Sequence, residues 1–144
     1  MEFLSNSADE TMNFAKNLAK EINQPKVFVL SGDLGAGKTT FSKGFAKGLG
    51  IDEIITSPTF TILNEYSGTL PLFHFDMYRL GSVEEAYALG FEEYFNNPTG
   101  VILVEWAENV PGLIQKPYTK IVFEKIDDEK RKITLEEIVW LHFV

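Results

Sequence analysis

Eight consecutive residues have the types and spacing of a loop that binds polyphosphates. Residues 32–39 read Gly-Asp-Leu-Gly-Ala-Gly-Lys-Thr, which matches the pattern G-x-x-x-x-G-K-[ST]. Glycines without a Cβ let backbone N–H groups converge on phosphate oxygens, and the helix that follows presents its positive end. We therefore expect Lys38 to lie on the β- and γ-phosphates of a nucleoside triphosphate and Thr39 to offer a hydroxyl to Mg²⁺.

The segments on either side of the loop support this interpretation. Residues 27–30 have strand character and residues 40–46 have helical spacing, so strand, loop and helix follow in the order that the motif requires. The residues that we predict to contact the nucleotide here are Asp33, Leu34, Gly35, Ala36, Gly37, Lys38, Thr39 and Thr40.

Such a site also needs a carboxylate, and two candidates stand at the ends of strand-like segments. In phosphate-loop enzymes an acid at the end of a buried strand usually orients Mg²⁺. Glu105 directly follows the short apolar run 101–104, which is typical of a strand buried on both faces. Asp76 ends the segment 72–76. Both acids are therefore predicted to reach the phosphate cleft.

Two residues close to these acids, His74 and Trp106, each have two possible roles. Alternation along a strand places His74 and Asp76 on one face and Phe73 and Phe75 on the other. His74 can either take part directly or support a neighbour by hydrogen bonding. Trp106 can either pack in the core or lie near the nucleotide or a partner.

Composition restricts the classes of function. A chain of 144 residues with 44% hydrophobic content has material for one core, so we predict a single phosphate-loop domain over residues 1–144. The net charge is −8, and residues 84–129 hold ten acidic side chains against three lysines. A broad nucleic-acid surface needs clustered Lys and Arg. A protein partner is therefore expected rather than direct contact with RNA.

Other features point to the cytoplasm. The chain has no cysteine, which excludes disulfides and cysteine metal sites. The first residues lack a basic segment followed by an apolar run, and no stretch has the roughly 18 apolar residues needed to span a bilayer. We therefore expect a cytoplasmic protein with no membrane partner.

The remaining pattern predicts an α/β fold: a P-loop NTPase-like mixed sheet flanked by helices, with antiparallel hairpin additions. Two S-x-x-E capping boxes, at 7–10 and 82–85, predict helix starts, and the first helix is expected to end near Pro25. Hairpins are predicted from strands 60–66 and 70–76 and from strands 121–126 and 131–135, and a short helical turn is predicted at 91–95. Residues 136–144 have no assignment.

Four segments in this order resemble the TsaE family, also called YjeE, the small bacterial ATPases of tRNA threonylcarbamoyladenosine biosynthesis. They are the phosphate loop with Thr40 and Phe41, Ser-Pro-Thr-Phe-Thr at 57–61, His-Phe-Asp-Met-Tyr-Arg-Leu at 74–80, and Val-Glu-Trp at 104–106. The resemblance covers roughly residues 7–135, and the second and third segments are far more specific than the phosphate loop.

The resemblance implies roles for individual residues. The phosphate loop, including Lys38, holds ATP, Thr39 and Glu105 bind Mg²⁺, and Asp76 is needed for hydrolysis. Thr11 and Arg131 lie near the base and ribose. Residues 57–61 resemble a switch segment that responds to the γ-phosphate. The family acts with the TsaB–TsaD pair, which modifies adenosine 37 of tRNAs reading codons that begin with A.

Three functions remain in competition. The first is a weak ATPase whose hydrolysis supports a partner's cycle. The second is a non-hydrolytic binding module that responds to ATP. The third is a small-molecule kinase, which is disfavoured because such enzymes need several cationic groups around the phosphoryl and the chain has only two arginines, Arg79 and Arg131.

Overall fold

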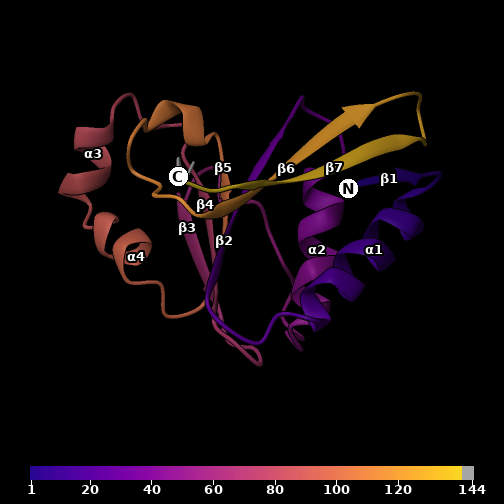
Figure 1. The fold of residues 1–144 in the computed structure, drawn as a ribbon, viewed down its shortest axis with the longest axis horizontal. Coiled ribbons are helices and arrows are strands. Elements are labelled where there is room, and N and C mark those ends of the chain that lie inside the picture. The colour runs from indigo at the N-terminus through magenta and orange to yellow at the C-terminus, as the bar shows by residue number, and fades with distance from the viewer. Residues whose placement is uncertain (141–144) are drawn as a thin grey trace, which may run out of the picture.

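A seven-stranded mixed sheet with helices on both faces forms the protein in this computed structural model, which describes residues 1–140 (Figure 1). The strands are β1 (Glu2–Ser5), β2 (Lys26–Gly32), β3 (Leu63–Tyr66), β4 (Leu72–Asp76), β5 (Val101–Glu105), β6 (Tyr118–Lys125) and β7 (Arg131–Ile138). The helices are α1 (Ala8–Lys20), α2 (Lys38–Gly48), α3 (Val83–Ala88), α4 (Glu92–Asn96) and the 3₁₀ turn η1 (Ala107–Asn109).

The strand order is β1-β7-β6-β2-β5-β4-β3. The four central strands β6, β2, β5 and β4 are parallel, whereas β7, β1 and β3 add antiparallel edges. This arrangement confirms the predicted α/β class, a P-loop NTPase-like sheet with hairpin additions. It also brings the carboxyl ends of β2, β4 and β5 together at one edge, where ligands bind in such sheets.

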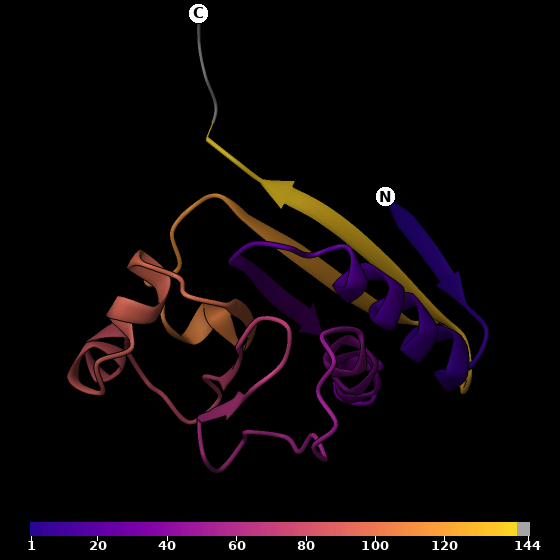
Figure 2. The same ribbon diagram turned by 90° about the horizontal axis from the view of Figure 1, so that it is seen from below.

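Two hydrophobic cores hold the layers together, one on each face of the sheet. The helices α1 and α2 lie together on the first face (Figure 2). There Phe41 and Phe45 of α2 are buried in one core with Phe28 of β2. Gly44 lets the two helices approach closely, because a Cβ at this position would overlap the Met12 carbonyl. The resulting contact fixes α2, and with it the loop that precedes it.

On the second face, aromatic side chains join α3 and α4 to the sheet. The ring centroid of Phe75 lies 5.0 Å from that of Phe91 and 5.1 Å from that of Phe95, within the range of favourable aromatic pairs. Because Phe75 points to this core, its neighbours His74 and Asp76 point to the α2 face, as alternation predicts.

Both predicted capping boxes are confirmed. The hydroxyl of Ser7 accepts a hydrogen bond from the backbone N–H of Glu10 at 3.1 Å, and that of Ser82 accepts one from Glu85 at 3.4 Å. Each glutamate also accepts from the backbone N–H just before its cap. The first helix ends at Lys20, earlier than the predicted end near Pro25.

Several predicted strand limits are wrong. The strand expected from Phe60 begins only at Leu63, because residues 58–62 form a turn in which Ile62 N–H donates to the Pro58 carbonyl and Ile62 has φ 69°. The second hairpin is longer than predicted: its strands span Tyr118–Lys125 and Arg131–Ile138. The β7 strand thus includes residues 136–138 of the unassigned tail, and residues 141–144 lie outside the described part.

The edge strand β1 had no counterpart in the prediction. It pairs with β7, and Phe3 lies opposite Ile133. Residues 1–140 contain no helix that combines the length and apolar character needed to cross a bilayer.

Candidate active site

A cavity of about 440 Å³ opens at the carboxyl ends of β2, β4 and β5. Its wall brings together residues that are far apart in the sequence. Of the predicted site residues, the wall contains Leu34, Gly35, Gly37, Lys38, Thr39, Thr40, Asp76, Glu105 and Arg131. Ser57, Thr59, Tyr78 and Trp106 complete it.

The phosphate loop connects β2 to α2. Gly37 has φ 103°, a left-handed conformation that favours glycine, and α2 begins at the next residue. The first turn of α2 carries no acidic side chain, so no residue of the helix itself offsets its positive end. The loop is therefore suited to an anionic ligand.

Lys38 extends from the first turn of α2 into the buried floor of the cavity. Its Nζ donates a hydrogen bond to the Gly32 carbonyl at 2.7 Å and lies 3.9 Å from Glu105 Oε1. It also lies 5.5 Å from the ring centroid of Trp106, which allows a cation–π contact. The ammonium group thus faces the predicted carboxylate.

Asp76 and Glu105 are register partners at the ends of the neighbouring parallel strands β4 and β5. Both are buried, with 4% and 8% of their surface exposed. The sequence predicted each acid at a strand end, but only the strand order places the two side by side in one cavity.

Asp76 also connects the cavity to the segment 57–61. Its Oδ1 accepts from Tyr78 N–H at 2.9 Å, and its Oδ2 accepts from the Thr59 hydroxyl at 3.0 Å. Ser57 Oγ lies 2.7 Å from Thr59 Oγ1. Because a carboxylate only accepts and a hydroxyl has one proton, Ser57 must donate to Thr59, which donates to Asp76.

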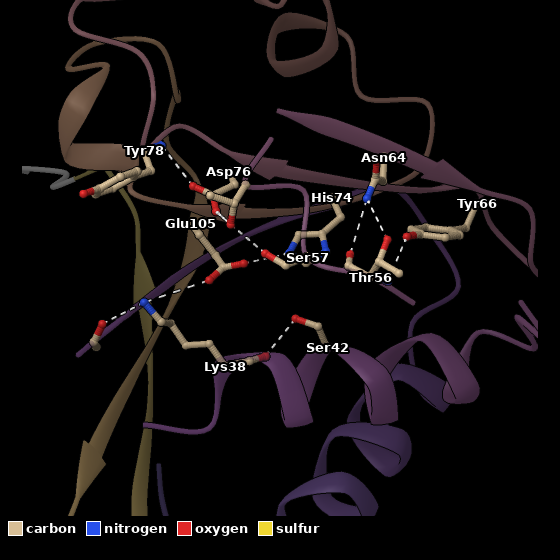
Figure 3. A network of polar contacts seen from close by, with 12 residues as sticks. Lys38, Ser42, Thr56, Ser57, Asn64, Tyr66, His74, Asp76, Tyr78 and Glu105 are labelled. Carbon is tan, nitrogen blue, oxygen red and sulfur yellow. Dashed lines mark hydrogen bonds and ion pairs between the residues drawn. The ribbon is translucent and has the colours of Figure 1, made fainter. Parts of the chain in front are cut away.

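Glu105 is held on its other side by His74. The ring Nε2 lies 3.0 Å from Glu105 Oε2, and both side chains are buried. Figure 3 shows Lys38, Glu105, His74 and Asp76 grouped above the start of α2. Of the two roles left open for His74, this contact supports hydrogen bonding to a neighbour.

Trp106 and Tyr78 form an aromatic wall of the cavity. Their ring centroids lie 5.1 Å apart in an edge-to-face arrangement, and Trp106 has φ 60°, which is unusual for a bulky residue. Because Trp106 lines the cavity and is only partly buried, it lies at the cavity rather than wholly in the core. Tyr78 was not predicted as a wall residue, although its position two residues after Asp76 is the available signal.

Arg131 joins the β6–β7 hairpin to the phosphate loop. Its guanidinium donates to the Gly35 carbonyl at 2.9 Å and to the Asp127 carbonyl at 2.7 Å. Thr11 does not line the main cavity. It is buried, its hydroxyl is 2.7 Å from Ser5 Oγ, and it lines an adjacent cavity of about 180 Å³ together with Arg131.

Two predicted loop residues lie outside the cavity wall. Asp33 is exposed, and Ala36 is buried in the core on the α2 face. Within residues 1–140 no group of three or more His, Asp or Glu side chains is arranged to hold a metal ion. Oxygen donors that line the cavity include the Thr39 hydroxyl and the carboxylates of Asp76 and Glu105, and such a set fits Mg²⁺, which commonly takes its remaining ligands from phosphate and water.

Comparisons with known proteins agree with this geometry. The family model described as "Threonylcarbamoyl adenosine biosynthesis protein TsaE" matches residues 5–133. The protein of Bacillus subtilis named tRNA threonylcarbamoyladenosine biosynthesis protein TsaE is 47% identical over 131 residues, covering 90% of this chain and 81% of its own length. The protein of the same name from Treponema pallidum is 42% identical over 135 residues, covering 94% and 99% of the two chains.

A solved structure is also similar. The crystal structure of Bacillus subtilis YdiB superimposes with a TM-score of 0.80 and 42% sequence identity, covering 94% of this chain and 83% of that one. The order of the four sequence segments, the mixed sheet and the family match agree with one another. This chain therefore belongs to the TsaE family.

Proposed function

We propose that the protein binds ATP with Mg²⁺ and hydrolyses it slowly. The observation that carries the proposal is the meeting of Lys38, Asp76 and Glu105 in one cavity beside the phosphate loop. A cation, two strand-end carboxylates and a helix N-terminus are the groups that phosphoryl transfer to water requires.

Each residue has a separate role in this proposal. Lys38 leaves the Gly32 carbonyl and Glu105 to bind the β- and γ-phosphates, while Thr39 and Glu105 hold the cation. The cation, when bound, neutralises phosphate charge and orients the phosphates. Asp76 orients the attacking water through an oxygen that now accepts from Thr59. Of the two arginines, Arg131 lines the cavity but donates to the Gly35 and Asp127 carbonyls, and Arg79 does not line the cavity. Without an arginine free to reach the phosphates, hydrolysis by the protein alone is slow.

The other loop residues contact ATP through backbone N–H groups, which explains why Asp33 and Ala36 can serve without lining the cavity by their side chains. Thr11 and Arg131 are assigned to the base and ribose, because the small cavity that they share adjoins Gly37 and Thr40 of the nucleotide site.

The names of the relatives indicate the biosynthetic process in which the protein acts. We assign the protein to formation of threonylcarbamoyladenosine at position 37 of tRNAs reading codons that begin with A, in the cytoplasm and together with TsaB and TsaD. The net charge of −8 supports contact with proteins rather than directly with tRNA.

One observation supports a second candidate function, that of a non-hydrolytic binding module that responds to ATP. The bond from Thr59 to Asp76 links the segment 57–61 to the site, so occupancy alone could change the surface that a partner sees. A kinase has less support: Arg131 is bound to the Gly35 carbonyl, and Arg79 lies over the exposed Phe60 ring at 5.0 Å.

The decisive experiment measures ATP hydrolysis with and without purified TsaB and TsaD, in parallel with tRNA modification. We expect slow hydrolysis alone, faster hydrolysis with the pair, and modification only when all three proteins and ATP are present. Modification that proceeds equally well without this protein would exclude the proposed process.

A further inference from the structure

One buried side chain of the site has a polar atom without a partner. His74 is 2% exposed, and within the described residues its Nδ1 makes no hydrogen bond. Buried polar atoms nearly always have a partner, so an exception calls for an explanation. The other ring nitrogen, Nε2, lies 3.0 Å from Glu105 Oε2 (Figure 3).

The neighbouring strands explain why His74 Nδ1 has no hydrogen-bond partner within the described residues. In the sheet, His74 lies between its register partners Asn64 on β3 and Leu103 on β5. Leucine offers no polar group. The Asn64 amide donates to the Thr56 carbonyl at 3.3 Å, and its oxygen accepts from Thr61 at 2.7 Å. Both polar ends of Asn64 are therefore committed to the loop before β3.

The same surroundings determine where the ring proton lies. A carboxylate can only accept, so the hydrogen bond to Glu105 requires the proton on Nε2. The arrangement therefore selects a ring that carries a proton on Nε2 and donates it to Glu105.

This bond leaves the two oxygens of Glu105 in different situations. Oε2 is anchored to a buried ring, whereas Oε1 lies 3.9 Å from Lys38 Nζ beside the cavity. We propose that His74 is a positioning residue, which fixes the rotation of the Glu105 carboxylate so that Oε1 is presented to the phosphate loop and its cation. The inference rests on the proposed function, because it takes Glu105 as the carboxylate that serves Mg²⁺.

Two substitutions separate positioning from packing. His74→Leu keeps an apolar side chain in the buried site but removes the donor, whereas His74→Gln carries an amide N–H at about the place of Nε2. Thr119→Val is the control, since Thr119 is equally buried on β6 but bonds to Glu137 and does not line the cavity. For each protein, calorimetry measures ATP affinity without Mg²⁺ and across a Mg²⁺ titration.

We expect the affinity without Mg²⁺ to be unchanged in all variants. The Mg²⁺ concentration for half-maximal enhancement should rise about tenfold or more in His74→Leu, since partners of metal ligands are typically worth 10- to 100-fold in metal affinity. His74→Gln should recover most of this loss, and Thr119→Val should behave as wild type. An unchanged Mg²⁺ dependence in His74→Leu, or no recovery in folded His74→Gln, overturns the proposal.

A spectroscopic measurement tests the proposal without substituting any residue of the cavity. The chain has two histidines, so a His142→Gln protein gives a single imidazole signal, and its ¹⁵N shifts show which ring nitrogen carries the proton. An Nε2 atom without a proton would overturn the proposal even if His74→Leu failed to fold. Wild-type protein that binds no ATP with Mg²⁺ would instead refute the proposed function itself, and the positioning role with it.

Discussion

At the scale of single residues, we expect nucleotide binding to depend most on the side chain of Lys38. It is buried beside Glu105, and in this structure its charge is satisfied by the Gly32 carbonyl. We predict that Lys38→Ala weakens ATP binding roughly 10- to 100-fold, because a hydrogen bond to a charged group contributes about 1.5–3 kcal/mol. Titration calorimetry measures the affinity, and exposed Lys43 on the same helix provides the control Lys43→Ala. Wild-type affinity in Lys38→Ala would refute the assignment of the loop.

Glu105 and Asp76 should differ in how their loss responds to Mg²⁺. Loss of a metal ligand can be offset in part by more metal, whereas loss of a group that orients water cannot. We therefore expect higher Mg²⁺ to restore part of the hydrolysis of Glu105→Ala and none of that of Asp76→Ala. Hydrolysis rates across a Mg²⁺ titration test this, and rescue of Asp76→Ala alone would reverse the two roles.

At the scale of elements, the packing of α1 against α2 fixes the position of α2 and of the phosphate loop that precedes it. Gly44 lies where any Cβ would overlap the Met12 carbonyl. Alanine in place of glycine within a helix usually stabilises by about 1 kcal/mol, but overpacking costs about 1–3 kcal/mol and the overlap here is with backbone. We predict that Gly44→Ala lowers the free energy of unfolding, as measured by denaturant titration.

A glycine outside this contact gives the matched control. At Gly81 the nearest atom to an added Cβ is Glu85 Oε1 at 3.7 Å, an ordinary contact distance. Gly81→Ala should therefore change stability little. A Gly44→Ala protein as stable as wild type would show that the two helices are packed less closely than described.

The turn of the β6–β7 hairpin should make stability depend on pH. The backbone N–H groups of Lys130 and Glu129 donate to Asp127 Oδ1 at 2.8 and 2.9 Å, and they lower the pKa of this carboxyl. Because the folded pKa lies below the unfolded value of about 3.9, the stabilisation is present above that value and is lost as pH falls through the folded pKa.

Asp127→Ala should accordingly lower the thermal midpoint at neutral pH, and the difference from wild type should shrink in strong acid. The neighbouring Asp128 has a fully exposed side chain, so Asp128→Ala is the control and should show little of this effect. A difference between Asp127→Ala and wild type that stays constant from neutral pH to strong acid would exclude the ionised carboxylate as its cause.

At the scale of the whole molecule, the link from the segment 57–61 to Asp76 sets the expected behaviour with partners. We predict that Asp76→Ala still binds ATP and the TsaB–TsaD pair but does not sustain repeated rounds of tRNA modification. The reason is that binding uses the phosphate loop, whereas resetting the cycle requires hydrolysis. Counting modified tRNA per protein molecule over time checks this prediction.

The outcome also separates the two candidate functions. Full modification over many rounds by an Asp76→Ala protein shown to lack hydrolysis would favour the binding module over the ATPase. A variant that no longer binds the pair would contradict the proposed division between binding and hydrolysis.

The local features of this protein were predictable from sequence because their signals are short-range. The phosphate loop, the capping boxes at Ser7 and Ser82 and the buried strand before Glu105 depend on residues within a few positions of one another. Residues 60–62 of the turn were mistaken for the start of a strand because Phe60 has strand propensity, although in the folded chain this side chain is exposed.

Only the tertiary structure decided which of these local features meet. Strand order makes Asp76 and Glu105 neighbours, β1 pairs with a strand almost the whole chain away, and Arg131 reaches the Gly35 carbonyl from the opposite end of the sequence. Propensity and periodicity carry no information on the order of strands, because any strand with a matching apolar face can pair locally. The residue types thus determined the chemistry available to the protein, and the packing of the sheet determined that it is gathered in one cavity.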